Sequence, residues 1–411
     1  MPALLRRPLV VALLIGLAAQ LLFSVNLARP HGLMFDEVHY VPAARAILAL
    51  DRPMNTEHPL LGKEMIAAGI AMFGDNAVGW RAFSTVAGTA TVLGVFAILW
   101  LLFGSVRTAS YGALFAALNF TVFIQARIAM LDGFMGAFVT LGIASLLWAM
   151  RAPPDRVMRR WLLGAVLLGL ATATKWAAAP YVAFAMVAFV IVRRGRANAW
   201  PGLTPIAAVL LLGTVSVTTY FVTFLPTLFY AHDALTPAGI IPFQWKMYDS
   251  QTQILSPHPY QSSWWSWPLL IRPIWYLYEP VDGAVRGVLL VGNPAIMWGG
   301  LVAVAALLWA WMRGSAKAGV VALLWAVSLA IWAVIPKSLG FYYYYHLSGI
   351  FLCIALAAAG HIYGRQSHSR WVAGYAIAAT LMFVHFYPII AAGALPDAQG
   401  FHRWMWLPSW R

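Results

Sequence analysis

Two adjacent carboxylates, Asp36 and Glu37, are the residues of this chain best suited to acid–base chemistry. They lie in the segment 34–40, directly after the first long apolar run. Only 10% of the 411 residues are charged, so a pair of acids at a membrane boundary calls for an explanation. An isolated pair of this kind is commonly a solvated loop or a helix cap. A carboxylate at a membrane surface can also act as a general base toward a hydroxyl nucleophile.

Several basic residues are predicted to lie at the same membrane face as these acids, namely Lys63, Arg81, Arg127 and Lys175. Each has a structural alternative: Lys63 and Arg81 as snorkelling anchors, Arg127 as a partner of Asp132, and Lys175 as a turn marker. Ionisable groups at membrane depth are costly and often functional. Because all of them map to one face, we interpret them together as a site for an anionic substrate such as a phosphate.

The sequence contains no nucleotide-binding loop, so the energy for a transfer reaction has to arrive in the substrate. A site that faces away from the cytoplasm has no access to nucleotide sugars. A sugar linked to a lipid phosphate is therefore a reasonable donor, although the residues do not indicate which sugar. Basic side chains can stabilise a departing phosphate. We therefore predict no cofactor and no metal site, with a divalent cation near the acids as the alternative.

Long apolar segments position these residues. The chain is 62% hydrophobic with a mean hydropathy of +0.76, whereas soluble domains are about half apolar and about a quarter charged. The apolar runs are continuous rather than alternating, which favours helices over a β-barrel. Runs of about 20 residues can cross a bilayer. Besides the run that ends near residue 27, they occur at 82–103, 108–126, 133–150, 161–175, 176–192, 203–228, 288–311, 317–335, 341–360 and 371–392. We predict an all-α polytopic membrane protein with about 11 transmembrane helices in a single domain, 1–411.

The charge distribution predicts the topology. With the N-terminus in the cytoplasm, the predicted cytoplasmic segments are the N-terminus, the turn at Arg107, and residues 151–160, 193–202, 312–317 and 361–370. They hold about half of the 27 basic residues but only one of the 13 acids, Asp155. This positive-inside bias accounts for the net charge of +14, so we predict no nucleic-acid partner. The C-terminus is then exoplasmic. The first apolar run could be a signal peptide, but it lacks a small-residue cleavage site. The single cysteine, Cys353, lies in an apolar run and is predicted to form no intrachain disulfide.

Two predicted exoplasmic segments are too long to be simple connections. Residues 29–81 carry the candidate catalytic acids and include a short interfacial helix at 41–50. Residues 229–287 are rich in aromatic residues, which are common interface anchors. Their density suggests instead a floor for a ligand. We predict substrate-binding roles for residues of both segments and of the turn at Asp132: His58, Asp132, His258, Tyr260, Gln261, Trp264 and Trp265.

Several motifs together resemble those of the protein O-mannosyltransferases. They are 35–40 (FDEVHY), 57–63 (EHPLLGK), 127–132 (RIAMLD), 258–262 (HPYQS), 264–268 (WWSWP), 292–294 (GNP), 342–345 (YYYY) and 405–410 (MWLPSW). The similarity spans nearly the whole chain. This family belongs to the GT-C membrane glycosyltransferases, which transfer mannose from a polyprenyl-phosphate carrier to Ser or Thr with inversion. The resemblance thus implies a GT-C fold, this lipid-linked donor, a polypeptide acceptor and an active site on the exoplasmic face of the inner membrane. Contact with the protein export machinery is a further expectation.

The resemblance also implies roles for individual residues. It assigns Asp36 the catalytic position with Glu37 beside it, and Arg81 a contact with the donor phosphate. We expect Lys63 and Arg127 to bind the same phosphate. The chain departs from the family pattern at Leu60, where a second proline is usual, and it lacks the β-trefoil MIR domain of eukaryotic members. The latter indicates a bacterial member and leaves acceptor recognition open.

Two other functions are compatible with parts of this sequence. One is a GT-C transferase that modifies lipid A or a cell-wall glycan, and the other is a transporter of lipid-linked sugars. A transporter would place functional charges within its spans and break helices at the bilayer centre. The clustering of ionisable residues at one face favours an enzyme.

Overall fold

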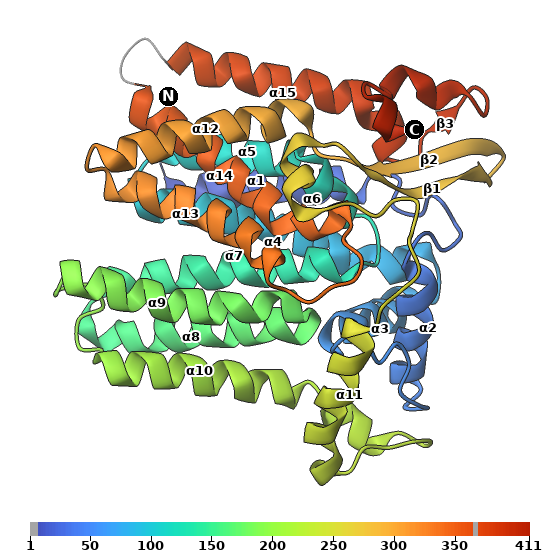
Figure 1. Cartoon of the computed structure of the whole chain (residues 1–411), viewed down its shortest axis with the longest axis horizontal. Helices are drawn as coiled ribbons and strands as arrows, with labels where there is room; N and C mark the ends of the chain where they lie inside the picture. Colours follow the sequence, from blue (N-terminus) through green and yellow to red (C-terminus); the bar gives the residue numbers. More distant parts are fainter. Residues whose placement is uncertain (1–6, 365–368) are drawn as a thin grey trace.

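The computed structural model describes residues 7–364 and 369–411, and it is dominated by long helices that run side by side (Figure 1). The helices are α1 Pro8–Ser24, α2 Glu37–Leu48, α3 Leu61–Phe73, α4 Ala77–Phe103, α5 Val106–Leu118, α6 Phe120–Gln125, α7 Leu131–Met150, α8 Pro154–Thr174, α9 Ala179–Gly195, α10 Pro205–Val222, α11 Ile240–Thr252, α12 Pro294–Met312, α13 Ala316–Ala330, α14 His346–Tyr363 and α15 Ser369–Ile390.

Within the described residues, nine helices are long and apolar enough to cross a membrane: α4, α7–α10 and α12–α15. They coincide with nine of the predicted spans. The first predicted span is α1, a shorter apolar helix. The predicted span at 108–126 is divided into α5 and α6, because the backbone at Asn119 is extended and its side chain accepts a hydrogen bond from the Thr121 N–H.

The two ends of the described chain lie at opposite ends of the bundle (Figure 1), as a protein with termini on opposite sides of a membrane requires. Which end faces the cytoplasm stays a prediction. The predicted cytoplasmic segments at the N-terminus and at 361–370 lie partly outside the described residues.

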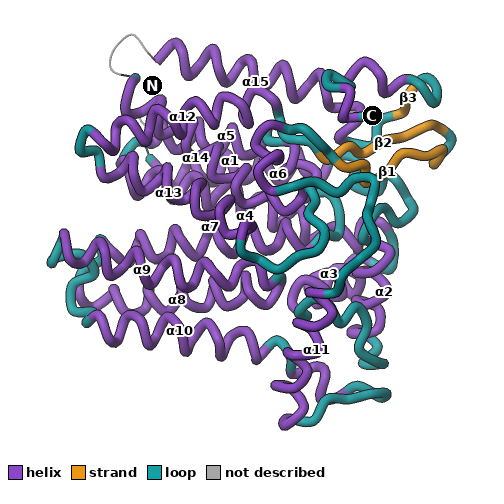
Figure 2. Tube along the Cα trace, in the orientation of Figure 1, coloured by secondary structure: helices purple, strands orange, loops and turns teal. Residues whose placement is uncertain are grey.

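The helical fold agrees with the prediction, and a small antiparallel sheet that was not predicted accompanies the helices. The sheet consists of β1 Ile274–Val281, β2 Ala284–Leu290 and β3 Ala394–Leu395, in the order β1-β2-β3 (Figure 2). Asp282 and Gly283 connect β1 to β2 with φ of 53° and 73°, the positive values that a two-residue hairpin turn requires. From the sequence alone, the first half of this hairpin is predicted to be an aromatic loop and the end of the second half part of the span at 288–311.

Three helices outside the long bundle lie at the same end of it as the sheet: α2, α3 and α11 (Figure 1). The predicted interfacial helix at 41–50 is α2, which begins earlier, at Glu37. The other two helices were not predicted. Glycines allow α3 to pack closely on α4, because a Cβ on Gly69 would lie 2.2 Å from the carbonyl oxygen of Gly79.

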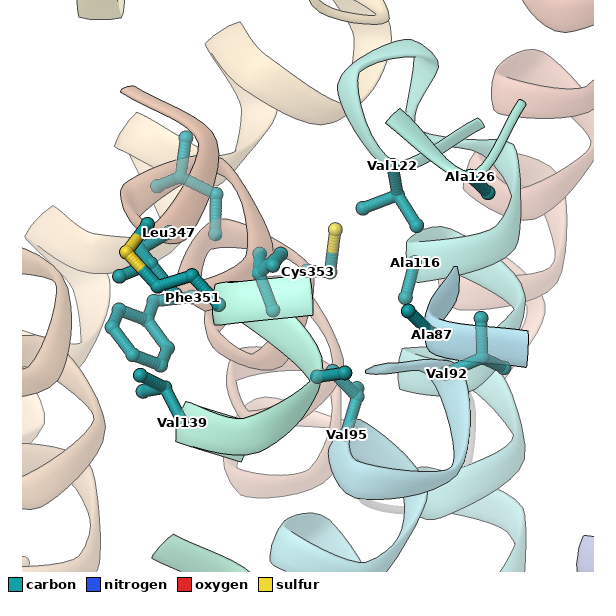
Figure 3. Close-up of a cluster of buried hydrophobic side chains, with 14 of the residues drawn as sticks. Ala87, Val92, Val95, Ala116, Val122, Ala126, Val139, Leu347, Phe351 and Cys353 are labelled. Atoms are coloured by element: carbon teal, nitrogen blue, oxygen red, sulfur yellow. The ribbon is translucent and has the colours of Figure 1, made fainter. Parts of the chain in front are cut away.

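The core of the bundle is formed largely by small and branched side chains of α4, α5, α7 and α14 (Figure 3). Val95, Val139 and Phe351 are fully buried there. Cys353 is buried in the same cluster as a free thiol, as predicted. Close helix contacts through small residues are typical of membrane bundles, where lipid offers no hydrophobic driving force. This packing fixes the first turns of α4 and α7 at the same end of the bundle, and these turns carry the candidate site.

Candidate functional site

Glu37 and Arg81 form a buried ion pair at this end of the bundle. Arg81 Nε lies 2.7 Å from Glu37 Oε1, and Arg81 Nη2 lies 2.7 Å from Oε2. Both side chains are inaccessible to solvent. Arg81 also donates to the carbonyl oxygens of Leu27, Pro30 and Gly32, so all five of its N–H groups are occupied.

The Glu37 carboxylate is equally saturated. It accepts hydrogen bonds from the backbone N–H groups of Met34, at 3.0 Å, and Ala129, at 2.9 Å. The pair therefore connects the loop before α2 to α4 and to the segment before α7. This arrangement does not favour two predicted roles, the phosphate contact of Arg81 and a direct catalytic role of Glu37. In the structure Arg81 has no N–H group left for a donor phosphate, and Glu37 has no free oxygen lone pair aimed at a substrate. We interpret both as positioning residues.

Asp36 differs from its neighbour, because the residue is half-buried and its carboxylate makes a single hydrogen bond among the described residues. That contact is a long hydrogen bond from the Tyr40 hydroxyl, at 3.4 Å. Burial raises the pKa of Asp36 above its usual range, and Asp132 adds to this, while the charges of Lys175 and His39 oppose it. Asp36 is thus a carboxylate with raised basicity and open coordination.

The residue before Asp36 has a strained backbone conformation. Phe35 has φ of 49°, which is uncommon for a residue with a bulky side chain. Its ring stacks on Tyr276 with centroids 4.1 Å apart and meets Tyr343 at 5.9 Å. Such strain persists where the surroundings hold it, often at functional sites. The stacking on β1 explains why an unpredicted strand contributes to this site.

Asp132 and Lys175 form a second buried pair beside Asp36. Lys175 Nζ lies 2.9 Å and 2.8 Å from the two Asp132 oxygens, and it lies 5.1 Å from the ring centroids of both Tyr343 and Tyr344. The predicted alternative that Asp132 pairs with Arg127 is therefore wrong. Lys175 directly follows α8 and Asp132 lies in the first turn of α7, so the pair joins two helix ends at the site.

In the structure, Arg127 and Lys63 both donate hydrogen bonds to backbone carbonyl oxygens. Arg127 donates to the carbonyl oxygens at the end of α1, those of Phe23, Val25 and Asn26. Lys63 Nζ donates to the carbonyls of Asn55, at 2.7 Å, and His58, at 2.8 Å. Burial lowers the pKa of Lys63 to about 7. Backbone oxygens thus bind the Lys63 ammonium and three of the five Arg127 N–H groups, and we interpret both residues as positioning these loops.

A cavity of about 740 Å³ opens beside the Asp132–Lys175 pair. Its walls are mainly apolar side chains of α9 and α10, such as Val182, Met186 and Phe221. Its polar end holds the following residues: His58, Lys175, Gln251, Lys337 and Tyr344. The site thus joins an apolar chamber to a cationic end.

Lys337 and Gln251 were missed by the sequence analysis. Lys337 donates to the Gln251 side chain, and Gln251 Nε2 lies 3.0 Å from His58 Nδ1. Burial and the charge of Lys175 lower the pKa of Lys337 to about 8. Burial, followed by the charges of Lys175, Lys63 and Lys337, lowers the pKa of His58 well below its ordinary value. The sequence feature that could have identified Lys337 is its place just after an apolar run, on the side of the membrane predicted to carry most of the acids.

The predicted aromatic floor is only partly assembled. Trp264 and Trp265 line a smaller cavity of about 240 Å³ that shares Lys337 and Tyr344 with the larger one. The other residues predicted there line neither cavity and organise their own loop. Gln261 accepts from the His258 backbone N–H, and the Tyr260 ring lies 5.3 Å from the Arg272 guanidinium.

Two protein-family models match this chain, one over each half. Residues 57–222 match the family model described as dolichyl-phosphate-mannose-protein mannosyltransferase. Residues 238–410 match the C-terminal four-transmembrane region of protein-O-mannosyltransferase. A polyprenol-phosphate-mannose–protein mannosyltransferase of Mycobacterium tuberculosis is 27% identical over 92% of this chain and 86% of its own length.

Two solved structures share the fold. The Saccharomyces cerevisiae protein O-mannosyltransferase Pmt1-Pmt2 complex bound to the sugar donor matches with a TM-score of 0.85 and 15% identity, over 100% of this chain and 94% of that chain. ArnT from Cupriavidus metallidurans bound to undecaprenyl phosphate matches less well, with a TM-score of 0.61 and 14% identity, over 92% of this chain and 76% of that one.

Proposed function

Because this chain belongs to the protein O-mannosyltransferase family of GT-C glycosyltransferases, we propose that it transfers mannose from a polyprenyl-phosphate carrier to Ser or Thr hydroxyls of exported proteins. The chain is a multi-pass membrane protein. The positive-inside charge bias supports an active site on the exoplasmic face of the inner membrane. Acceptors on that face would arrive through the protein export machinery.

The proposed mechanism rests on a difference in hydrogen bonding between the three acids of the site. Glu37 is saturated by Arg81 and two backbone N–H groups, and Asp132 is held by Lys175. Asp36 alone among these three combines partial exposure with a single long hydrogen bond. A general base needs an accessible lone pair and a pKa shifted toward neutrality. Asp36 has both.

The proposed reaction is one inverting displacement. The acceptor hydroxyl oxygen forms a bond to the anomeric carbon of mannose while the bond from that carbon to the phosphate oxygen breaks. The hydroxyl proton goes to Asp36, and the carrier leaves as polyprenyl phosphate. Fixed positive charges near the leaving oxygen stabilise the charge that develops there.

The apolar cavity along α9 and α10 fits the isoprenoid part of such a donor, and its cationic end fits the phosphate. Lys337 and Lys175 replace the predicted ligands Arg81, Lys63 and Arg127 in this proposal. Lys337 is the stronger candidate, because both oxygens of Asp132 hold Lys175. The residues that bind phosphate thus differ from those that organise the loops around it.

The alternatives receive less support. A transferase directed at lipid A or a cell-wall glycan would share the architecture, but the match to ArnT is weaker and covers less of both chains than the match to the yeast complex. A transporter is not supported, since both matching family models describe mannosyltransferases.

A transfer assay in membranes tests the proposal. It uses radiolabelled polyprenyl-phosphate-mannose, a Ser/Thr-rich peptide, and the Asp36→Asn variant. Asp249→Asn is the matched control, because Asp249 is exposed on α11 and lines neither cavity. We expect labelled peptide from the wild type and the control but not from Asp36→Asn. Incorporation into lipid A or glycan without labelled peptide would contradict the proposed acceptor.

A further inference from the structure

A second apolar cavity, of about 540 Å³, lies at the opposite end of the bundle from Asp36. Its position follows from α7, which begins beside the site at Asp132 and ends at Met150, a residue of the cavity wall. Side chains of α9 and α13 form much of the lining. On α9, Tyr181 and Phe189 line this cavity, whereas Val182 and Met186 line the cavity of about 740 Å³ proposed for the donor. One helix therefore separates two cavities that share no lining residue.

Basic residues from three helix ends surround the outer end of this cavity. Arg151 follows α7, Arg196 follows α9, and Lys317 lies in the first turn of α13. Arg151 and Arg196 both act electrostatically on Lys317. The lining contains no Asp or Glu among the described residues. Asp155, the acid nearest in sequence, lies 3.6 Å from Arg156 instead.

The start of α13 makes this cluster more than a consequence of membrane topology. The N-terminus of a helix carries positive potential and normally favours an acidic side chain or a capping oxygen. The first turn of α13 has no acidic residue, and Ser315 makes no side-chain cap. Instead it presents Lys317 beside two arginines. An anion bound here would satisfy free N–H groups and relieve the repulsion among three cations.

From this combination we propose that the cavity binds an anionic phospholipid of the leaflet opposite the active site. Its phosphate would lie among Arg151, Arg196 and Lys317 at the start of α13, and an acyl chain would enter the apolar space between α9 and α13. Trp311, which is 44% exposed, lines the cavity, and Trp is a side chain that favours the level of lipid headgroups. Basic pockets between transmembrane helices bind lipid headgroups in this way. The proposal is independent of the transfer reaction.

Native mass spectrometry of the full chain, titrated with dioleoyl-phosphatidylglycerol or dioleoyl-phosphatidylcholine, tests the charge requirement. We expect retention of phosphatidylglycerol over phosphatidylcholine, and a loss of affinity of about fivefold for each cation changed to Gln in the set Arg151, Arg196 and Lys317. The matched control changes Arg159, Arg194 and Arg313, which are exposed basic residues outside the cavity lining. Equal losses in the two triple variants, or equal retention of both lipids, would overturn the site.

A cavity-filling variant tests the apolar part without changing charge. Ala188 lines the cavity, whereas its neighbour Val187 is 57% exposed and does not. Ala188→Phe should therefore displace phosphatidylglycerol, and Val187→Phe should not. Soluble glycerol phosphate should fail to compete, because it lacks a chain to bury. Competition by glycerol phosphate would indicate a free-phosphate site instead, and stronger retention of undecaprenyl phosphate than of phosphatidylglycerol would contradict the proposed occupant.

Discussion

Glu37 and Arg81 bind each other through two hydrogen bonds of 2.7 Å in a place that solvent does not reach. The residues are 44 positions apart in the sequence, and their contact fixes the loop between α1 and α2 against α4. Because Asp36 directly precedes Glu37 in the chain, this contact also holds Asp36 at the site. One carboxylate of the adjacent pair is thus used to build the site and the other remains available to react.

This division of roles predicts different consequences for two matched substitutions. Asp36→Asn should lower transfer by about 10²–10⁴-fold, the usual effect of losing a general base, with an unchanged unfolding temperature. Glu37→Gln should lower the unfolding temperature, because it leaves the Arg81 charge buried without its partner. Transfer rates and thermal unfolding of both variants in detergent measure this. A stable, inactive Glu37→Gln beside an active Asp36→Asn would reverse the assignment.

Arg81 should behave as a structural residue rather than a phosphate ligand. Arg81→Ala should destabilise the protein by about 3–5 kcal/mol, as expected when one partner of a buried pair is removed. Lys should rescue it only partly, because it cannot supply five N–H groups. Arg45 is the matched control, since it forms a similar two-bond pair with Asp75 but both side chains are nearly half exposed. Arg45→Ala should cost about 1 kcal/mol or less. A stable Arg81→Ala protein with a raised KM for the donor would restore the phosphate role.

The sequence predicted the long helices well, because continuous hydropathy determines them without reference to the rest of the chain. The motifs also select Asp36 and the exoplasmic face, and both stay predictions. The sequence could not predict that Arg81 and Lys63 are fully occupied and Arg127 partly so, since their partners, the Glu37 carboxylate and several backbone carbonyls, are brought close only by folding. The hairpin of β1 and β2 was missed because its aromatic side chains are also typical of a membrane interface. Lys337 was missed because it belongs to none of the recognised motifs.

The mechanism places no step on a metal ion, so chelation should leave transfer intact. Incubation of membranes with EDTA, followed by the radiolabel assay, should give the rate of untreated membranes. Addition of Mg²⁺ or Mn²⁺ should not increase it. A loss of activity that returns with either cation would indicate a metal near the acids, the alternative that the carboxylates of Asp36 and Asp132 leave open.

The predicted topology can be checked by cysteine labelling, because the native Cys353 is buried. Ser263 and Arg194 are both exposed and lie in segments predicted to face opposite sides of the membrane. Ser263→Cys should react with an impermeant reagent from the exoplasmic side, and Arg194→Cys should react only after the membrane is opened. Labelling of both from one side would contradict the positive-inside assignment.

The pH dependence of donor use should report on Lys337. Its pKa is lowered to about 8 by burial and by the charge of Lys175, so Lys337 is cationic below about pH 8 and neutral above it. The attraction between Lys337 and the donor phosphate is therefore lost as the pH increases. The KM for polyprenyl-phosphate-mannose should rise above pH 8. Neither neighbour should produce the same change. His58 has a pKa well below its ordinary value and stays neutral throughout, and Lys63, with a pKa of about 7, has largely lost its proton before this range.

Substitution separates this effect from a general alkaline loss of activity. Lys337→Arg keeps its charge to high pH, so its KM should stay level where that of the wild type rises. Lys337→Ala should have a raised KM at every pH and no further increase above 8. Lys246→Arg, at an exposed position of α11 outside both cavities, should keep the wild-type profile. If Lys337→Arg shows the same alkaline rise as the wild type, the titrating group is another one, and the phosphate site has to be sought around Lys175.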